Sequence, residues 1–218
     1  MSKPLSYTFK DIDIQNNETF AGIFASLRGN DEYDDYIDYR GLKVHPLFRM
    51  YLIGECKIQI NWIKTRQDFP QGIDASIHNA RLNILDGSKN KTKKGFVFMY
   101  DRWFPKPVPL LCTPIKFHNK EKQHQGKWVS LYNVWEREVT SGHPVHTYMH
   151  RESWWNNYGV VIEKKRENNY RLYFSCGVDK HLNITFEDLI VDVSIEGEYT
   201  TRFQCSGDPR DILKPNKF

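Results

Sequence analysis

GFVFMYDR, residues 95–102, is an unbroken apolar run that closes on a charged pair. Apolar residues on both faces of a short run are typical of a strand that is buried on both sides, so the sequence predicts a central strand over residues 95–101. The run lies between the lysine-rich segment 89–94 and the proline-bearing segment 103–109. Because no catalytic motif accompanies it, we expect a binding or assembly protein rather than an enzyme.

Alternation of apolar and polar residues predicts further strands on both sides of this run. In residues 56–62 the side chains of Cys56, Ile58, Ile60 and Trp62 share one face, which is the pattern of a half-buried strand. Related patterns occur at 81–85, 128–139, 145–149, 158–163, 170–176 and 189–195, and the polar segment 163–169 is expected to form a turn. No segment predicts an amphipathic helix. Long loops between short strands favour a jelly-roll-like antiparallel β-sandwich.

The N-terminal part of the chain has a different character. Residues 31–39 alternate acids with tyrosines and show no clear period, which favours a loop whose rings pack on a neighbouring surface. We therefore expect residues 1–50 to form a mostly irregular arm. This arm would pack on a sandwich built from residues 51–218.

Charge and cysteine content indicate the class of partner and the compartment. The formal net charge is +4, with basic residues gathered near 89–94, 116–127 and 163–166. Such an uneven distribution suits contact with a polyanion or a charged partner. The four cysteines are widely spaced and contain no CxxC pair, so we expect buried reduced thiols in the cytoplasm or nucleus. The sequence shows no signal peptide and no membrane span, so we expect no membrane insertion.

Motifs for metal binding and catalysis are weak or missing from the sequence. His143, His146 and His150 have a spacing that suggests zinc, but His143 and His146 would point to opposite faces of a strand. Cys112 precedes Thr-Pro in what the sequence suggests is a loop, and no nucleophile elbow or nucleotide-binding glycine loop occurs. We therefore expect no enzyme activity, no cofactor and no metal site.

Basic residues interleaved with aromatic residues suggest a nucleic-acid contact. Lysine and arginine neutralise phosphates, and aromatic faces stack on exposed bases. The candidate phosphate contacts are Lys89, Lys91, Lys93, Lys94, Arg102, Lys164, Lys165 and Arg166. The candidate aromatic contacts are Trp103, Trp154 and Trp155, which can stack on bases or anchor a subunit interface. Solvated turns and a sugar-binding surface remain the alternatives for these two sets.

The segment around the apolar run also resembles a known family. Asn83–Asp86 leads into the polar turn Lys89–Thr92, and Phe96–Arg102 is followed by a loop that contains Pro105. This order resembles the single jelly-roll proteins of small plant viruses, above all the geminivirus coat and nuclear-shuttle proteins. The resemblance implies a jelly roll that self-assembles and contacts single-stranded nucleic acid, in a virion if the protein forms a coat.

The resemblance departs from the family at the N-terminus. Such coat proteins usually begin with an arginine-rich arm, whereas residues 1–50 are mildly acidic. A coat-derived movement or nuclear-shuttle protein is therefore an alternative, and Asp101 resembles the aspartate that closes the corresponding strand in movement proteins. A carbohydrate-binding β-sandwich is a third possibility. Our leading hypothesis is a coat-type structural protein that forms homo-oligomers or a capsid and contacts single-stranded nucleic acid.

Overall fold

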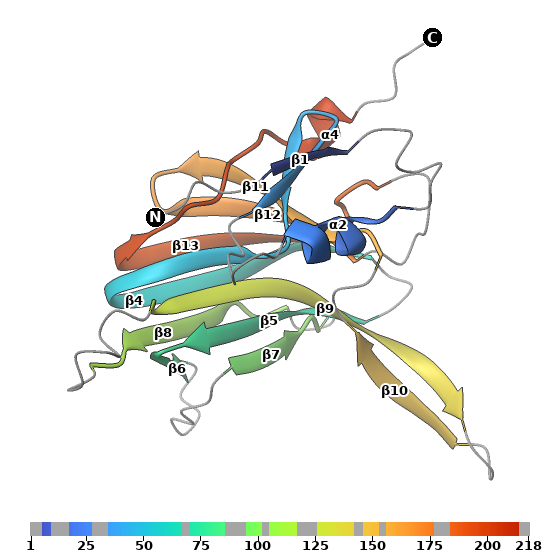
Figure 1. The fold of residues 1–218 in the computed structure, drawn as a ribbon. Coiled ribbons are helices and arrows are strands. Elements are labelled where there is room, and N and C mark those ends of the chain that lie inside the picture. Colours follow the sequence, from blue (N-terminus) through green and yellow to red (C-terminus); the bar gives the residue numbers. More distant parts are fainter. Residues whose placement is uncertain are drawn as a thin grey trace.

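The structure is a computed structural model that describes most of the chain, in segments separated by gaps. The described residues are 6–9, 18–27, 35–66, 70–85, 95–101, 105–116, 126–141, 146–152, 156–176 and 184–213. Strands dominate them (Figure 1). The strands are β1 Ser6–Phe9, β2 Tyr36–Tyr39, β3 Leu42–His45, β4 Phe48–Thr65, β5 Gln71–His78, β6 Ala80–Ile84, β7 Gly95–Met99, β8 Val108–Pro114, β9 Trp128–Ser141, β10 His146–Glu152, β11 Tyr158–Arg166, β12 Asn169–Cys176 and β13 Leu189–Thr200. The helices are α2 Phe20–Leu27 and α4 Pro209–Ile212.

The described strands form one hydrogen-bonded sheet that is antiparallel except for the β1–β2 pair. Its order is β1-β2-β3-β11-β12-β13-β4-β9-β5-β7, with β10 added to β9, and with β8 pairing with β4 and β6. Strand β4 organises the fold, because its N-terminal part pairs with β9 and its later part pairs with β8, while β13 pairs along the other edge. The sheet therefore divides along β4 into two parts. This all-β arrangement is consistent with the predicted sandwich, which is thus confirmed.

The larger hydrophobic core lies between the two parts of the divided sheet. Ile58 and Ile60 of β4 contribute to it from one side, and Ile73 and Leu131 contribute from β5 and β9. The predicted alternation in β4 is confirmed, since Cys56, Ile58 and Ile60 are buried while Lys57 and Gln59 are exposed.

A second core covers the opposite face of the β3–β11–β12–β13 region. Val161, Tyr173 and Ile190 face this core, and α2 packs on it with Phe20, Ile23 and Phe24 (Figure 1). The segments Tyr158–Ile162, Leu172–Cys176 and Leu189–Val191 are consequently buried on both faces, whereas the other ends of β11, β12 and β13 are more exposed. None of the described helices is long and apolar enough to cross a membrane.

Strand β7 differs from its prediction. The sequence predicts a wholly buried central strand, but β7 pairs only with β5 among the described residues, and each of its residues is only partly buried. Phe96 and Phe98 pack on the larger core while Val97 lies on the other face. An apolar run can thus occur in a strand at the end of a sheet, because its two phenylalanines already bury one face.

The N-terminal part is also more ordered than the arm predicted for residues 1–50. Residues 36–39 form β2 rather than a loop, and Ile37 and Tyr39 are buried. The helix α2 was not expected, and neither were the strands β5 and β8. Strand β4 begins at Phe48 and runs through the boundary predicted after residue 50.

The cysteines are free thiols, as predicted, with one difference in burial. Cys56, Cys112 and Cys176 are buried, whereas Cys205 is exposed. Cys112 lies in β8, opposite Cys56 of β4, and not in the loop that the sequence suggested. Burial raises the pKa of the Cys56 thiol to about 11 and raises that of Cys112 as well. Both thiols therefore stay protonated near neutral pH, and protonated thiols are poor nucleophiles.

Candidate functional site

The β11–β12 hairpin carries the predicted basic residues that the structure describes. Lys164, Lys165 and Arg166 end β11, and the turn at Glu167 and Asn168 leads into β12. A turn within the predicted segment 163–169 is confirmed, but it is confined to Glu167 and Asn168 because β11 extends to Arg166. Asn168 has a φ of 57°, in the left-handed region that asparagine tolerates better than most residues. A register shift between Lys164 and Arg166 marks a bulge, which changes the direction of the side chains just before the turn.

A groove of about 350 Å³ lies beside this hairpin, and we call it the basic groove. Lys165 and Arg166 border it, and the neighbouring strands supply amide and hydroxyl groups. The lining residues are Asn61, Lys165, Arg166, Asn169, Tyr170, Asp192, Val193 and Ser194. They meet because Asn169 pairs with Ser194 and Asp192 pairs with Asn61 across β12, β13 and β4.

Two carboxylates near the basic groove, Asp192 and Glu163, have cationic partners. Both oxygens of Asp192 accept hydrogen bonds from Arg171, from Nε at 2.7 Å and from the terminal nitrogen at 2.8 Å. Lys165 Nζ lies 3.1 Å from Glu163 Oε1, and the other Glu163 oxygen accepts a hydrogen bond from the Tyr173 hydroxyl. Within the described part of the chain, Lys164 and Arg166 form no ion pair, so the hairpin retains excess positive charge.

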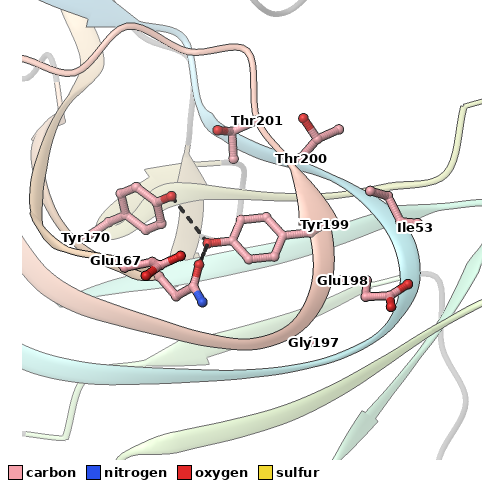
Figure 2. Close-up of a pocket in the computed structure, with 9 residues that line it drawn as sticks. Ile53, Glu167, Tyr170, Gly197, Glu198, Tyr199, Thr200 and Thr201 are labelled. Carbon is pink, nitrogen blue, oxygen red and sulfur yellow. Dashed lines mark hydrogen bonds between the residues drawn. The ribbon is translucent and has the colours of Figure 1, made fainter.

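A second hollow, of about 520 Å³, lies on the other side of the hairpin turn, and we call it the tyrosine hollow (Figure 2). Its lining consists of Ile53, Glu167, Asn168, Tyr170, Gly197, Glu198, Tyr199, Thr200 and Thr201. Figure 2 shows the phenols of Tyr170 and Tyr199 pointing toward one another. Tyr170 lines both the hollow and the basic groove, so the two depressions adjoin at this residue.

The hydroxyl groups in the tyrosine hollow have a defined direction of donation. The Tyr199 hydroxyl donates to Asn168 Oδ1 at 2.8 Å, so its oxygen accepts from the Tyr170 hydroxyl, 3.3 Å away. Burial, and then this contact with Tyr170, raises the pKa of Tyr199 above its usual value. Tyr199 therefore stays neutral near physiological pH, where it holds the hairpin turn against β13 and is not available as a base.

The other predicted contacts lie outside the described residues. These are Lys89, Lys91, Lys93, Lys94, Arg102, Trp103, Trp154 and Trp155. His143 lies outside as well, while His146 and His150 lie on β10. No group of histidine, cysteine and carboxylate side chains suited to a metal ion occurs in the part of the chain that is described.

The sequence did not predict the residues that form the walls of the basic groove and the tyrosine hollow. Asn61, Ser194 and Tyr199 are distant in sequence from the hairpin and meet it only through strand register. In the sequence these residues appear only as outward-facing positions of alternating strands. Because most strands with one solvated face have such positions, the pattern does not identify a site. Comparisons with protein-family models, curated proteins and solved structures found no match to this chain.

Proposed function

We propose that this protein is a non-enzymatic structural protein that contacts single-stranded nucleic acid and associates with itself, the role that the coat-type resemblance implies. The observation that carries the proposal is the basic groove beside the β11–β12 hairpin. It places Lys165 and Arg166 next to the amides of Asn61 and Asn169, with the one carboxylate in its lining already held by an arginine.

The chemistry of the groove suits a phosphodiester backbone. Lysine and arginine neutralise phosphate charge, and side-chain amides and hydroxyls add hydrogen bonds to phosphate and sugar oxygens. The Arg166 guanidinium can donate two parallel hydrogen bonds to one phosphate. A single strand is the preferred form because a short hairpin presents neither a helix nor a ribbon long enough for the major groove of a duplex.

Neutralising the hairpin tests this proposal directly. We expect the double variant Lys165→Gln/Arg166→Gln to bind an oligodeoxythymidylate of about 20 nucleotides roughly tenfold more weakly at low salt, because it loses two phosphate contacts. Fluorescence anisotropy measures the affinity. The matched control is Arg81→Gln/Lys116→Gln, which removes two exposed cations from a different part of the surface. Equal losses in both double variants would contradict a role for the groove.

Self-association is supported by the β9–β10 hairpin. Figure 1 shows β10 and the end of β9 extending away from the sandwich. Among the described residues, Glu136 is the last of β9 whose amide bonds to the body, by donating to the Pro70 carbonyl. Strand β10 pairs with β9 from Glu152–Trp135 out to His146–Ser141. In the part of the chain that the structure describes, β10 pairs only with β9, and the free edge of such an arm favours pairing with another chain.

Shortening this arm tests self-association. We expect the full chain to form oligomers or particles by size-exclusion chromatography with light scattering. A variant in which an Asn-Gly turn replaces residues 138–149 keeps the inner pairs of the hairpin and is expected to have a lower assembly mass. Large uniform particles would favour a coat, and low-order oligomers would favour a movement or nuclear-shuttle protein. A monomeric full chain would contradict self-association.

A carbohydrate is a second candidate ligand, favoured by the tyrosine hollow. Its phenols, carboxylates and threonine hydroxyls match the hydrogen-bonding groups of a sugar. Neutral oligosaccharides should then bind with an affinity that salt does not change, and Tyr199→Phe should weaken that binding. Calorimetry with a panel of oligosaccharides measures this, and absence of heat across the panel would remove the candidate.

A further inference from the structure

A row of stacked side chains crosses strands β4, β9 and β5 on the face turned away from the larger core. We call Arg49, Tyr51, Trp128, His78 and Arg202 the aromatic row. Tyr51 pairs with Trp128 and Trp128 pairs with His78, so the three rings lie on one face of neighbouring strands. The residues next to them, Met50, Val129 and Ile77, pack on the core instead.

The rings of this row are held in a defined stack. The His78 ring lies on Trp128 with 5.0 Å between centroids and an angle of 16° between planes. From the β4 side, the Arg49 guanidinium carbon lies 4.1 Å from the centroid of the indole. Arg49 is itself only 5% exposed, and its Nε donates to Ser130 Oγ at 3.1 Å. The indole is therefore fixed before any ligand arrives, and the stack ends at His78, which is exposed.

Cationic groups accompany the rings. The Arg202 guanidinium carbon lies 4.4 Å from the centroid of the Tyr51 ring. Two carboxylates of the described residues on the same face, Asp74 and Glu198, stand further along their strands. Asp74 is four residues from His78, about 13 Å along β5, and accepts a hydrogen bond from Ser76. Glu198 is two residues before Thr200, the partner of Tyr51, about 7 Å along β13.

We infer that the aromatic row is a base-stacking surface for single-stranded nucleic acid. A planar base placed on the exposed face of His78 continues the existing stack, and Arg202 provides positive charge for an adjoining phosphate. The positive charge and the flat rings together favour a polyanionic ligand with planar bases, and they disfavour an uncharged sugar. The inference rests on the proposed function and adds a second contact, in which the protein stacks on bases rather than binding phosphates.

The test compares two oligomers of the same length and charge. One is an oligodeoxythymidylate of about 20 nucleotides, and the other is an abasic strand that has the same phosphates without the bases. Anisotropy titrations with the full-length protein should show about tenfold tighter binding of the oligomer that carries bases. His78→Ala should remove this preference by weakening only the base-bearing oligomer, whereas His78→Phe, which keeps a flat ring, should retain it.

The groove variant separates the failure of this inference from the failure of the proposed function. Lys165→Gln/Arg166→Gln should weaken both oligomers and leave their ratio unchanged. Equal binding of both oligomers by the unmodified protein would overturn base stacking but keep the phosphate contact. A His78→Ala variant that loses affinity for both oligomers equally, or retains the full preference, would also overturn it. No binding of either oligomer would overturn the proposed function together with the inference.

Discussion

At the scale of single residues, His45 shows how burial ties one side chain to the stability of the fold. The imidazole is completely buried and lies against the rings of Tyr36 and Phe203. The Gln204 amide donates to its Nε2 at 3.1 Å, so His45 holds the segment that follows β13 onto the sheet. Burial is the main cause that lowers its pKa from 6.5 to about 4. The folded protein thus contains neutral His45 at every pH above that value.

This shift predicts that stability falls in mild acid. In the unfolded chain the imidazole takes up a proton near pH 6.5, but in the fold it does so only near pH 4, so acid favours the unfolded state between these values. We expect the free energy of unfolding to decrease by about 2 kcal/mol from pH 7 to pH 5, measured by urea denaturation. His45→Gln should flatten this dependence. An unmodified protein of constant stability over this range would contradict the shift.

Gly197 carries a second prediction at this scale. Its φ is +120°, and a Cβ atom there would lie 2.2 Å from the Glu55 carbonyl oxygen, which is backbone and cannot move away cheaply. Gly197→Ala should therefore lower the free energy of unfolding by about 2 kcal/mol or more. Gly207→Ala is the control, since its nearest contact is the Ile212 methyl at 3.6 Å, and it should be nearly neutral. Similar denaturation midpoints for the two variants would contradict this account.

At the scale of elements, the sequence predicted strands whose alternation is strong and missed those whose alternation is interrupted. Strand β13 alternates between buried Val191 and Val193 and the more exposed Asp192 and Ser194, as expected. Strand β5 begins with Gln71 and Gly72, both buried, and β8 contains two prolines, so neither shows a regular pattern. The basic hairpin could be predicted because its residues are contiguous. The groove walls and the aromatic row could not, because strand register brings their residues together.

The helix α2 escaped prediction because it is short and depends on tertiary packing. Phe20 is fully buried, with centroid distances of 5.0 Å to Phe9, 5.3 Å to Tyr39 and 6.4 Å to Phe186. Phe20→Ala should lower the free energy of unfolding by about 3–5 kcal/mol, as for other large buried aromatics. Ser26→Ala, on the exposed side of the same helix, is the control and should change it little. A small effect at Phe20 would mean that the second core contributes little to stability.

At the scale of the whole molecule, the proposed contacts are built on strands rather than on separate flexible segments. The base of the β11–β12 hairpin is buried on both faces, between the two cores, and the aromatic row lies on strands that pack on the larger core. A surface supported in this way is formed before the ligand binds, so little conformational entropy is lost on binding. We therefore expect the circular dichroism spectrum of the protein to stay unchanged when an oligonucleotide is added.

The central claim is that this protein binds single-stranded nucleic acid through its phosphates, and the salt dependence of binding tests it most directly. We would titrate an oligodeoxythymidylate of about 20 nucleotides between about 50 and 200 mM salt and plot the logarithm of affinity against that of salt concentration. The account predicts a steep negative slope, which becomes shallower by about 1.4 in Lys165→Gln/Arg166→Gln, at about 0.7 for each lost phosphate contact. Binding that does not change with salt, or no binding at the lowest salt, would contradict it.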